Sequence, residues 1–304
     1  MTQKRYPQGM LGACNTPWTD KYKLDEKMFE KHLKGMMAKG YTEMYVMGTA
    51  GEGYAVSEAQ FRNIVDVFVA VTRKPGINPQ VGVINMSTST IVDRIKYCYD
   101  KGVRMFQLSL PNWQAMNDAE MLAFFKLVCG TYPDAKFLHY NLIRTKRVLT
   151  GDDYRKVADA VPNLVATKNS SYDMNAIREM MVRAPEIQHF FVQNAFAFGA
   201  LFGECSLLCS LGGVFPNLTK ELFDTARTGN VKRSFEINNR MMEAAKGMFG
   251  HLKAGYVDGA YDKALEALVD PDFPRRLLPP YETLPDADFA VIKKYFEEKC
   301  RDIS

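Results

Sequence analysis

Short β-type runs alternate strictly with longer helical patterns from the N-terminus to Gly229, and this alternation constrains the fold more than any other feature. Eight runs have the length and the apolar content of strands: Met10–Asn15, Met44–Met47, Gln80–Ile84, Met105–Leu108, Lys136–Tyr140, Leu164–Lys168, Gln188–Val192 and Ser206–Ser210. A helical pattern follows each of them: Glu26–Ala38, Glu58–Thr72, Thr90–Lys101, Ala119–Thr131, Asp152–Ala160, Met174–Arg183, Ala195–Phe202 and Lys220–Thr228. Alternating βα units favour a parallel sheet, and eight units are what a closed (β/α)8 TIM barrel requires.

Residues at the ends of the helical patterns support these boundaries. Predicted N-caps precede three helices at Ser57, Asp118 and Asp173, and glycines follow three others at Gly40, Gly102 and Gly229. The main competing fold is an open, doubly wound sheet. That fold calls for a phosphate-binding fingerprint at the first βα turn, where this chain has Asn15-Thr16-Pro17.

After Gly229 the strand-like runs stop. The remaining patterns are helical, at Val231–Phe249, Ala260–Leu268 and Asp288–Lys299, and a proline-rich loop separates the last two. We therefore expect a catalytic barrel over residues 1–229 and a C-terminal helical extension over residues 230–304, in an α/β protein.

Composition and charge narrow the classes of function. The net charge of +4 is spread along the chain without a basic arm, which argues against nucleic acid as a partner. No apolar run approaches 18 residues and the first residues are polar, so we expect no membrane contact and a cytoplasmic protein. The six cysteines have irregular spacing without CxxC, and the four histidines form no HExxH, so we predict buried reduced thiols and no metal site.

Lys168 and Tyr140 end two neighbouring predicted strands, where barrel enzymes carry their active sites. Period-two alternation places Lys168 inside the barrel mouth, where desolvation is expected to lower the pKa of its amine and make it a nucleophile for carbonyl carbons. Tyr140 is expected one strand spacing away, within reach to exchange protons with that amine. The alternatives are a solvated lysine that starts a loop and a tyrosine that only packs in the core. His139 should face the helices and be structural.

Three further segments near predicted strand ends can contact a ligand. The loop Gly48-Thr49-Ala50-Gly51-Glu52-Gly53 is small enough to bring backbone N–H groups to a carboxylate, although it also suits a tight turn, and its spacing is not that of a nucleotide-binding loop. Trp113 can wall the mouth, or pack between helix and loop. Arg144, Lys146 and Arg147 can clamp an acidic group, or form a solvated basic loop.

In combination these residues resemble the dihydrodipicolinate synthase / N-acetylneuraminate lyase family of class I aldolases. The resemblance spans nearly the whole chain. It rests on four segments, which are Thr16-Pro17, Gly48-Thr49-Ala50-Gly51-Glu52 with Ser57-Glu58 beyond, Tyr140-Asn141, and Lys168-Asn169-Ser170-Ser171.

The resemblance implies a homotetramer or homodimer in which Lys168 forms a Schiff base with pyruvate or a related 2-keto acid. Tyr140 would relay protons with support from the Thr49 hydroxyl, and the Gly48–Ala50 turn would hold the carboxylate on the amides of Thr49 and Ala50. Other predicted substrate contacts are Trp113, Arg144 and Leu208. No metal or organic cofactor is implied, because the protonated imine is itself the electron sink.

Three positions depart from the synthases of the resembled family. Ala50 stands in place of a second threonine, Trp113 in place of a tyrosine contributed across a subunit contact, and the arginine at 144 is one position early. We therefore expect a member that is not a true dihydrodipicolinate synthase. The predicted function is a lyase that makes or breaks a C–C bond next to the keto group, with an aldehyde as a further partner. The alternatives are dehydration of a 2-keto-3-deoxy sugar acid through the same imine, and a non-catalytic keto-acid-binding protein.

Overall fold

A closed barrel of eight parallel strands forms the centre of the molecule. The computed structural model describes residues 3–253 and 255–301, and in it each strand pairs with the next and the eighth with the first. The strands are β1 (Met10–Ala13), β2 (Glu43–Val46), β3 (Asn78–Gly82), β4 (Met105–Leu108), β5 (Lys136–Asn141), β6 (Leu164–Asn169), β7 (Gln188–Val192) and β8 (Ser206–Leu208). The predicted (β/α)8 barrel is confirmed. Predicted strand ends ran too far at β1, β3 and β8, where the chain turns early into loops at the barrel mouth.

Alternation along the strands separates an inner from an outer layer. Leu11, Tyr45, Leu138, Ala166 and Phe190 pack together inside the barrel. Residues of opposite parity pack outward in the larger core between strands and helices, among them Val46, Phe106 and Phe137. The period of two therefore decides which side chains reach the mouth of the barrel.

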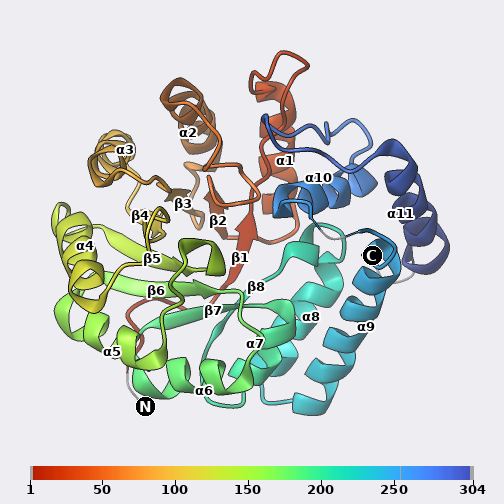
Figure 1. Ribbon diagram of the computed structural model, residues 1–304. Coiled ribbons are helices and arrows are strands. Elements are labelled where there is room, and N and C mark those ends of the chain that lie inside the picture. Colours follow the sequence, from red (N-terminus) through yellow and green to blue (C-terminus); the bar gives the residue numbers. More distant parts are fainter. Residues whose placement is uncertain (1–2, 254, 302–304) are drawn as a thin grey trace.

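In the described part of the chain one α-helix follows each strand, and these eight helices surround the barrel (Figure 1). They are α1 (Glu26–Ala38), α2 (Glu58–Thr72), α3 (Thr88–Asp100), α4 (Asp118–Gly130), α5 (Gly151–Ala160), α6 (Met174–Arg183), α7 (Gln193–Gly199) and α8 (Pro216–Arg227). Ser57 and Asp173 cap their helices as predicted, but the predicted cap Asp118 is wrong. Asn117 caps α4 instead, in a reciprocal capping box with Glu120.

The C-terminal helices α9 (Val231–Phe249), α10 (Asp258–Val269) and α11 (Asp286–Lys299) follow the eighth βα unit. Figure 1 shows α9 beside α8 and α11, whereas α10 lies over the barrel near α1. Two side-chain contacts join α10 and its end to α1: His32 Nδ1 lies 2.9 Å from Glu266 Oε1, and Lys31 forms an ion pair with Asp270 at 2.7 Å. Within the two described ranges, no helix is long and apolar enough to cross a membrane.

A buried ion pair ties α10 to the loop that follows β2. The carboxylate of Glu52 accepts from the ammonium of Lys263, and both side chains are fully shielded from solvent. Glu52 also accepts from Trp18 Nε1 at 2.6 Å and from the Leu278 N–H at 2.6 Å, and Lys263 donates to the Arg276 carbonyl at 2.6 Å. Burial lowers the pKa of Lys263 to about 8 although Glu52 acts to raise it. Such a pair is tolerated in the interior because its remaining donors and acceptors are satisfied.

Replacing Glu52 by glutamine should destabilise the protein strongly. The substitution leaves the Lys263 ammonium buried without its counter-charge, which costs about 3–5 kcal/mol when one partner of a buried pair is removed. The measurement is the free energy of unfolding from guanidinium denaturation. The control is Glu30→Gln, which breaks the exposed Glu30–Lys34 pair at 2.9 Å and should leave the midpoint nearly unchanged. Equal midpoints for both variants would contradict the structural importance of the buried pair.

Candidate active site

Lys168 lies inside the mouth of the barrel, near the end of β6. Only 3% of the residue is exposed, and it continues the inward-facing row that includes Ala166. Strand register pairs it with Tyr140 on β5, and Lys168 Nζ lies 3.8 Å from the centroid of the Tyr140 ring. Tyr140 and Lys168 therefore lie next to each other on neighbouring strands, as predicted.

Thr49 connects the loop after β2 to this pair. Its hydroxyl oxygen is 3.5 Å from the Tyr140 hydroxyl, at the long end of a hydrogen bond. Tyr140 is thus flanked by a hydroxyl on one side and by an ammonium on the other, which is an arrangement suited to passing a proton.

Tyr45 is a site residue that the sequence analysis missed. It projects inward from β2, and its hydroxyl accepts a hydrogen bond from Lys168 Nζ. The same nitrogen lies 4.3 Å from the Tyr45 ring centroid. In an eight-stranded barrel closed in chain order, β2 and β6 face each other, so this contact spans the interior. The period of two along β2 was the available signal, because it places Tyr45 and Val46 on opposite faces of the strand and Tyr45 packs inside the barrel.

The surroundings of Lys168 favour its charged form. Desolvation by burial acts to lower the pKa of Lys168, but the phenol groups of Tyr140 and Tyr45 outweigh burial and raise it above its usual value. The expectation of a lowered pKa was therefore wrong, since it treated the lysine as an isolated buried amine. Burial raises the pKa of Tyr45 to about 12, although Lys168 acts to lower it.

A cavity of about 430 Å³ opens beside Lys168. Strand ends and the loops that follow them supply most of its wall, including the predicted residues Thr49, Ala50, Tyr140, Arg144, Lys168 and Leu208. Among the residues that the structure describes, the N–H groups of Thr49 and Ala50 donate to no other group. Both residues line the cavity, so their amides are available to an anion bound there.

The turn that presents these amides is held in a strained conformation. Met47 has φ +66° and Glu52 has φ +53°, a region that costs a non-glycine residue about 1–3 kcal/mol. Gly53 allows the close return of the chain, since a Cβ there would lie 2.1 Å from the Met47 carbonyl oxygen. Glu52 is held by the ion pair with Lys263, and this pairing stabilises the strained turn.

The helical extension also lines the cavity, which the sequence analysis did not anticipate. Asp258, Tyr261 and Asp262 of α10 reach its wall. Asp258 accepts two hydrogen bonds from Arg144, at 2.7 and 3.1 Å. Arg144 therefore lies where it was predicted to lie, but its charge is already neutralised. Burial, reinforced by Asp258, raises the pKa of Asp262 to about 7, whereas Lys168 acts to lower it.

Two predicted substrate contacts lie off the cavity wall. Gly48 instead makes room for the ring of Tyr45, because a Cβ at Gly48 would lie 2.4 Å from Tyr45 Cε2. Trp113 is 81% exposed in the single chain and does not line this cavity.

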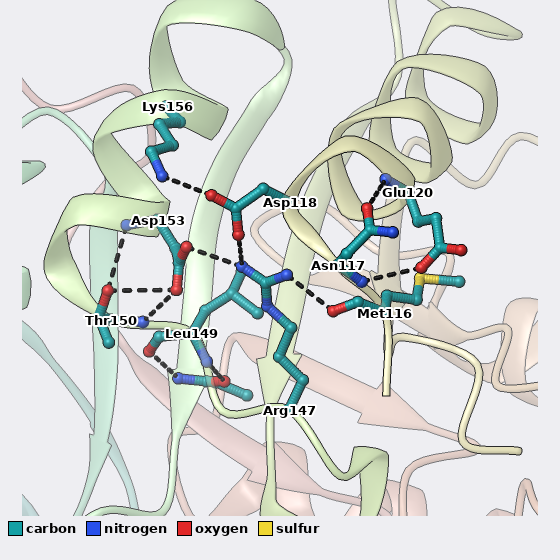
Figure 2. A network of polar contacts seen from close by, with 10 residues as sticks. Met116, Asn117, Asp118, Glu120, Arg147, Leu149, Thr150, Asp153 and Lys156 are labelled. Carbon is teal, nitrogen blue, oxygen red and sulfur yellow. Dashed lines mark hydrogen bonds and ion pairs between the residues drawn. The ribbon is translucent and has the colours of Figure 1, made fainter. Parts of the chain in front are cut away.

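Lys146 and Arg147 hold neighbouring segments together and do not line the cavity. Arg147 donates to Asp118, to Asp153 and to the Met116 carbonyl, at 2.7, 2.9 and 2.7 Å. Figure 2 shows these contacts between the starts of α4 and α5. Lys146 donates to the Trp113 carbonyl at 2.9 Å. Arg147 thus joins the starts of α4 and α5, and Asp118 is free for this role because Asn117 makes the cap.

His139 has the structural role that was predicted for it. It is fully buried, its Nδ1 lies 2.9 Å from the Tyr154 hydroxyl of α5, and burial lowers its pKa to about 3. The imidazole is therefore neutral and takes no part in the cavity.

Known proteins resemble this chain over most of its length. The 4-hydroxy-tetrahydrodipicolinate synthase of Sulfurimonas denitrificans is 23% identical over 79% of this chain and 82% of its own. The solved structure of YagE, a prophage protein of E. coli K12 in complex with pyruvate, superposes with a TM-score of 0.86 at 15% identity and covers 95% of this chain and 97% of its own. A sialic acid aldolase of Ruminococcus gnavus, solved as its catalytic lysine mutant, gives 0.84 at 18% identity and covers 95% and 94%. The model of the dihydrodipicolinate synthetase family matches residues 6–270, and the chain belongs to that family.

Proposed function

We propose that this protein is a class I aldolase-type lyase that forms an imine between Lys168 and pyruvate or a related 2-keto acid. The observation that carries the proposal is a buried lysine amine placed between two phenols, at the edge of a cavity with two unengaged backbone amides. YagE was solved with pyruvate, and family membership makes a keto acid the first ligand to test. The six buried cysteine thiols suit a reducing cytoplasm.

The first step is imine formation. The keto-acid carboxylate binds to the amides of Thr49 and Ala50, which brings the C2 carbonyl to Lys168 Nζ. The amine must first release a proton, and the neighbouring phenol oxygens are positioned to pass it on. The C–N bond then forms, the carbonyl oxygen takes a proton from the Tyr140 phenol and leaves as water, and Tyr140 is left as a phenolate beside the positively charged nitrogen.

The second step makes the C–C bond. Tyr140, as phenolate, removes a proton from C3, and the electron pair moves into the enamine as the positive charge on nitrogen is lost. C3 then attacks the aldehyde carbon, and the Tyr140 phenol returns the proton to the aldehyde oxygen while the nitrogen regains its charge. Water finally hydrolyses the imine to release the product and the free amine. Cleavage follows the same steps in reverse, and no cofactor is needed in either direction.

Incubation with pyruvate followed by borohydride reduction should fix the keto acid covalently on the peptide that carries Lys168. Peptide mass mapping is the measurement. Lys168→Ala should abolish the adduct, whereas Lys146→Ala, which lies after β5 on the outside of the cavity, should retain it. No adduct with pyruvate or a panel of 2-keto acids would exclude the imine and favour the non-catalytic alternative.

A product assay separates the aldolase from the dehydratase. Hydroxylated 2-keto acids are supplied as substrates, and pyruvate is followed with lactate dehydrogenase alongside loss of water. Pyruvate release is the expected result. Water loss without pyruvate would identify the dehydratase, which uses the same imine.

Replacing Tyr45 by phenylalanine should shift the pH dependence of trapping. Tyr45 helps to raise the pKa of Lys168, so the variant should have a lower lysine pKa and more free amine at a given pH. The curve of trapping rate against pH should therefore move to lower pH. Tyr154→Phe removes a buried hydroxyl outside the barrel and serves as the matched control. An unchanged Tyr45→Phe profile would refute the role of this hydroxyl.

We also propose that the functional form is a homotetramer or homodimer with Trp113 at a subunit contact. Trp113 and Ile143 are both 81% exposed in the single chain, on loops that follow β4 and β5. Light scattering after size exclusion should give a multiple of 34.5 kDa, and Trp113→Ser should shift the mass toward that of one chain. A monomeric wild-type protein would contradict this assembly.

A further inference from the structure

Asp262 contributes to the wall of the cavity a carboxyl group with no hydrogen-bond donor among the described residues. It lies in the second turn of α10 and lines the cavity with Lys168. Within residues 3–253 and 255–301, its carboxyl group makes no hydrogen bond or ion pair. The side chain is half-buried, and its carboxyl group borders the cavity, where no group of the described residues competes for its oxygens. A donor group of a bound substrate can therefore take this position.

The position of Asp262 is fixed by its neighbours on α10. Lys263 is bound to Glu52 beneath the loop after β2, and Glu266 pairs with His32 of α1. Both contacts are made by residues that follow Asp262 on the same helix, so the helix cannot rotate to bring its carboxyl group out of the cavity without breaking them. The carboxyl group is therefore preorganised toward a ligand.

The charges in the cavity indicate which donor fits. Arg144 is neutralised by Asp258, and Lys168 is consumed as the imine nitrogen. Among the described residues that line the cavity there is no further Lys or Arg, so a second carboxylate on the substrate would meet Asp258 and Asp262 without a cation to receive it. A hydroxyl group, in contrast, donates to a carboxylate and accepts from a carboxylic acid, so it fits Asp262 in either protonation state. Hydroxyl groups of Ser170, Ser210 and Tyr261 make the same wall polar without adding charge.

We propose that Asp262 is a specificity-determining residue that hydrogen-bonds a hydroxyl group of the substrate beyond the reacting carbonyl. The inference rests on the proposed aldolase function and deepens it. The acceptor is accordingly a neutral hydroxyaldehyde, and the cleavage substrate is a polyhydroxylated 2-keto acid that carries a single carboxylate.

The test compares three aldehydes with pyruvate as the common donor: glyceraldehyde, propanal, which has the same three carbons without hydroxyls, and succinic semialdehyde, which carries a carboxylate. For wild type, kcat/KM should be highest with glyceraldehyde and lowest with succinic semialdehyde. Asp262→Leu should lower kcat/KM for glyceraldehyde by about tenfold to a hundredfold, as expected when a buried hydroxyl loses a charged partner, and change propanal by less than about threefold.

Two controls make the outcome specific. Asp270→Asn removes a carboxylate at the end of the same helix, where it pairs with Lys31, and should leave the ratio between aldehydes unchanged. Borohydride trapping of pyruvate by Asp262→Leu should match that of wild type, which shows that the variant folds and forms the imine.

The possible results distinguish a failure of the role of Asp262 from a failure of the proposed aldolase function. Intact trapping combined with an equal loss for glyceraldehyde and propanal, or with an unchanged ratio, would overturn the role of Asp262 and leave the aldolase standing. A wild type that prefers succinic semialdehyde would also overturn it. A wild type that traps no keto acid would overturn both.

Discussion

The ion pair between Glu52 and Lys263 is the interaction on which the rest of this site depends. One partner belongs to the strained turn after β2 and the other to α10, so the pair fixes two segments that lie more than 200 residues apart in sequence. The turn presents the amides of Thr49 and Ala50, and the helix presents Asp258 and Asp262. Desolvation of both charges is compensated by Trp18, the Leu278 amide and the Arg276 carbonyl. The helical extension is in this way a wall of the cavity, and the barrel alone does not enclose it.

The sequence was sufficient for those parts of the structure that depend on local pattern. Alternation of strands and helices predicted the barrel, and the parity of residues along β5 and β6 predicted that Tyr140 and Lys168 meet. Both inferences need only the pairing of consecutive strands, which is the rule in a parallel barrel. The resemblance to a family then supplied the chemistry that the pair can perform.

The missed features depend on contacts between segments distant in sequence. Tyr45 reaches Lys168 across the barrel, and no period along β2 states which strand lies opposite. Asp262 could not be placed because the position of α10 depends on its contacts with Glu52 and His32, which are distant in sequence, and the pattern of α10 alone does not reveal them. Arg147 and Arg144 were both read as anion clamps, but each already holds carboxylates of neighbouring segments. The pKa of Lys168 was misjudged for the same reason, since burial was counted and the two phenols were not.

The contact between Tyr45 and Lys168 ties the reactivity of the lysine to the cross-section of the barrel. The two side chains start from opposite walls, so their separation follows the width of the interior along that diameter. A substitution that makes the barrel more oval, even one in the outer core between strands and helices, lengthens or shortens this one hydrogen bond. The protonation of the amine then changes without any change at the residues around it. In this protein the packing between strands and helices therefore influences the pKa of the Lys168 amine through its contact with Tyr45.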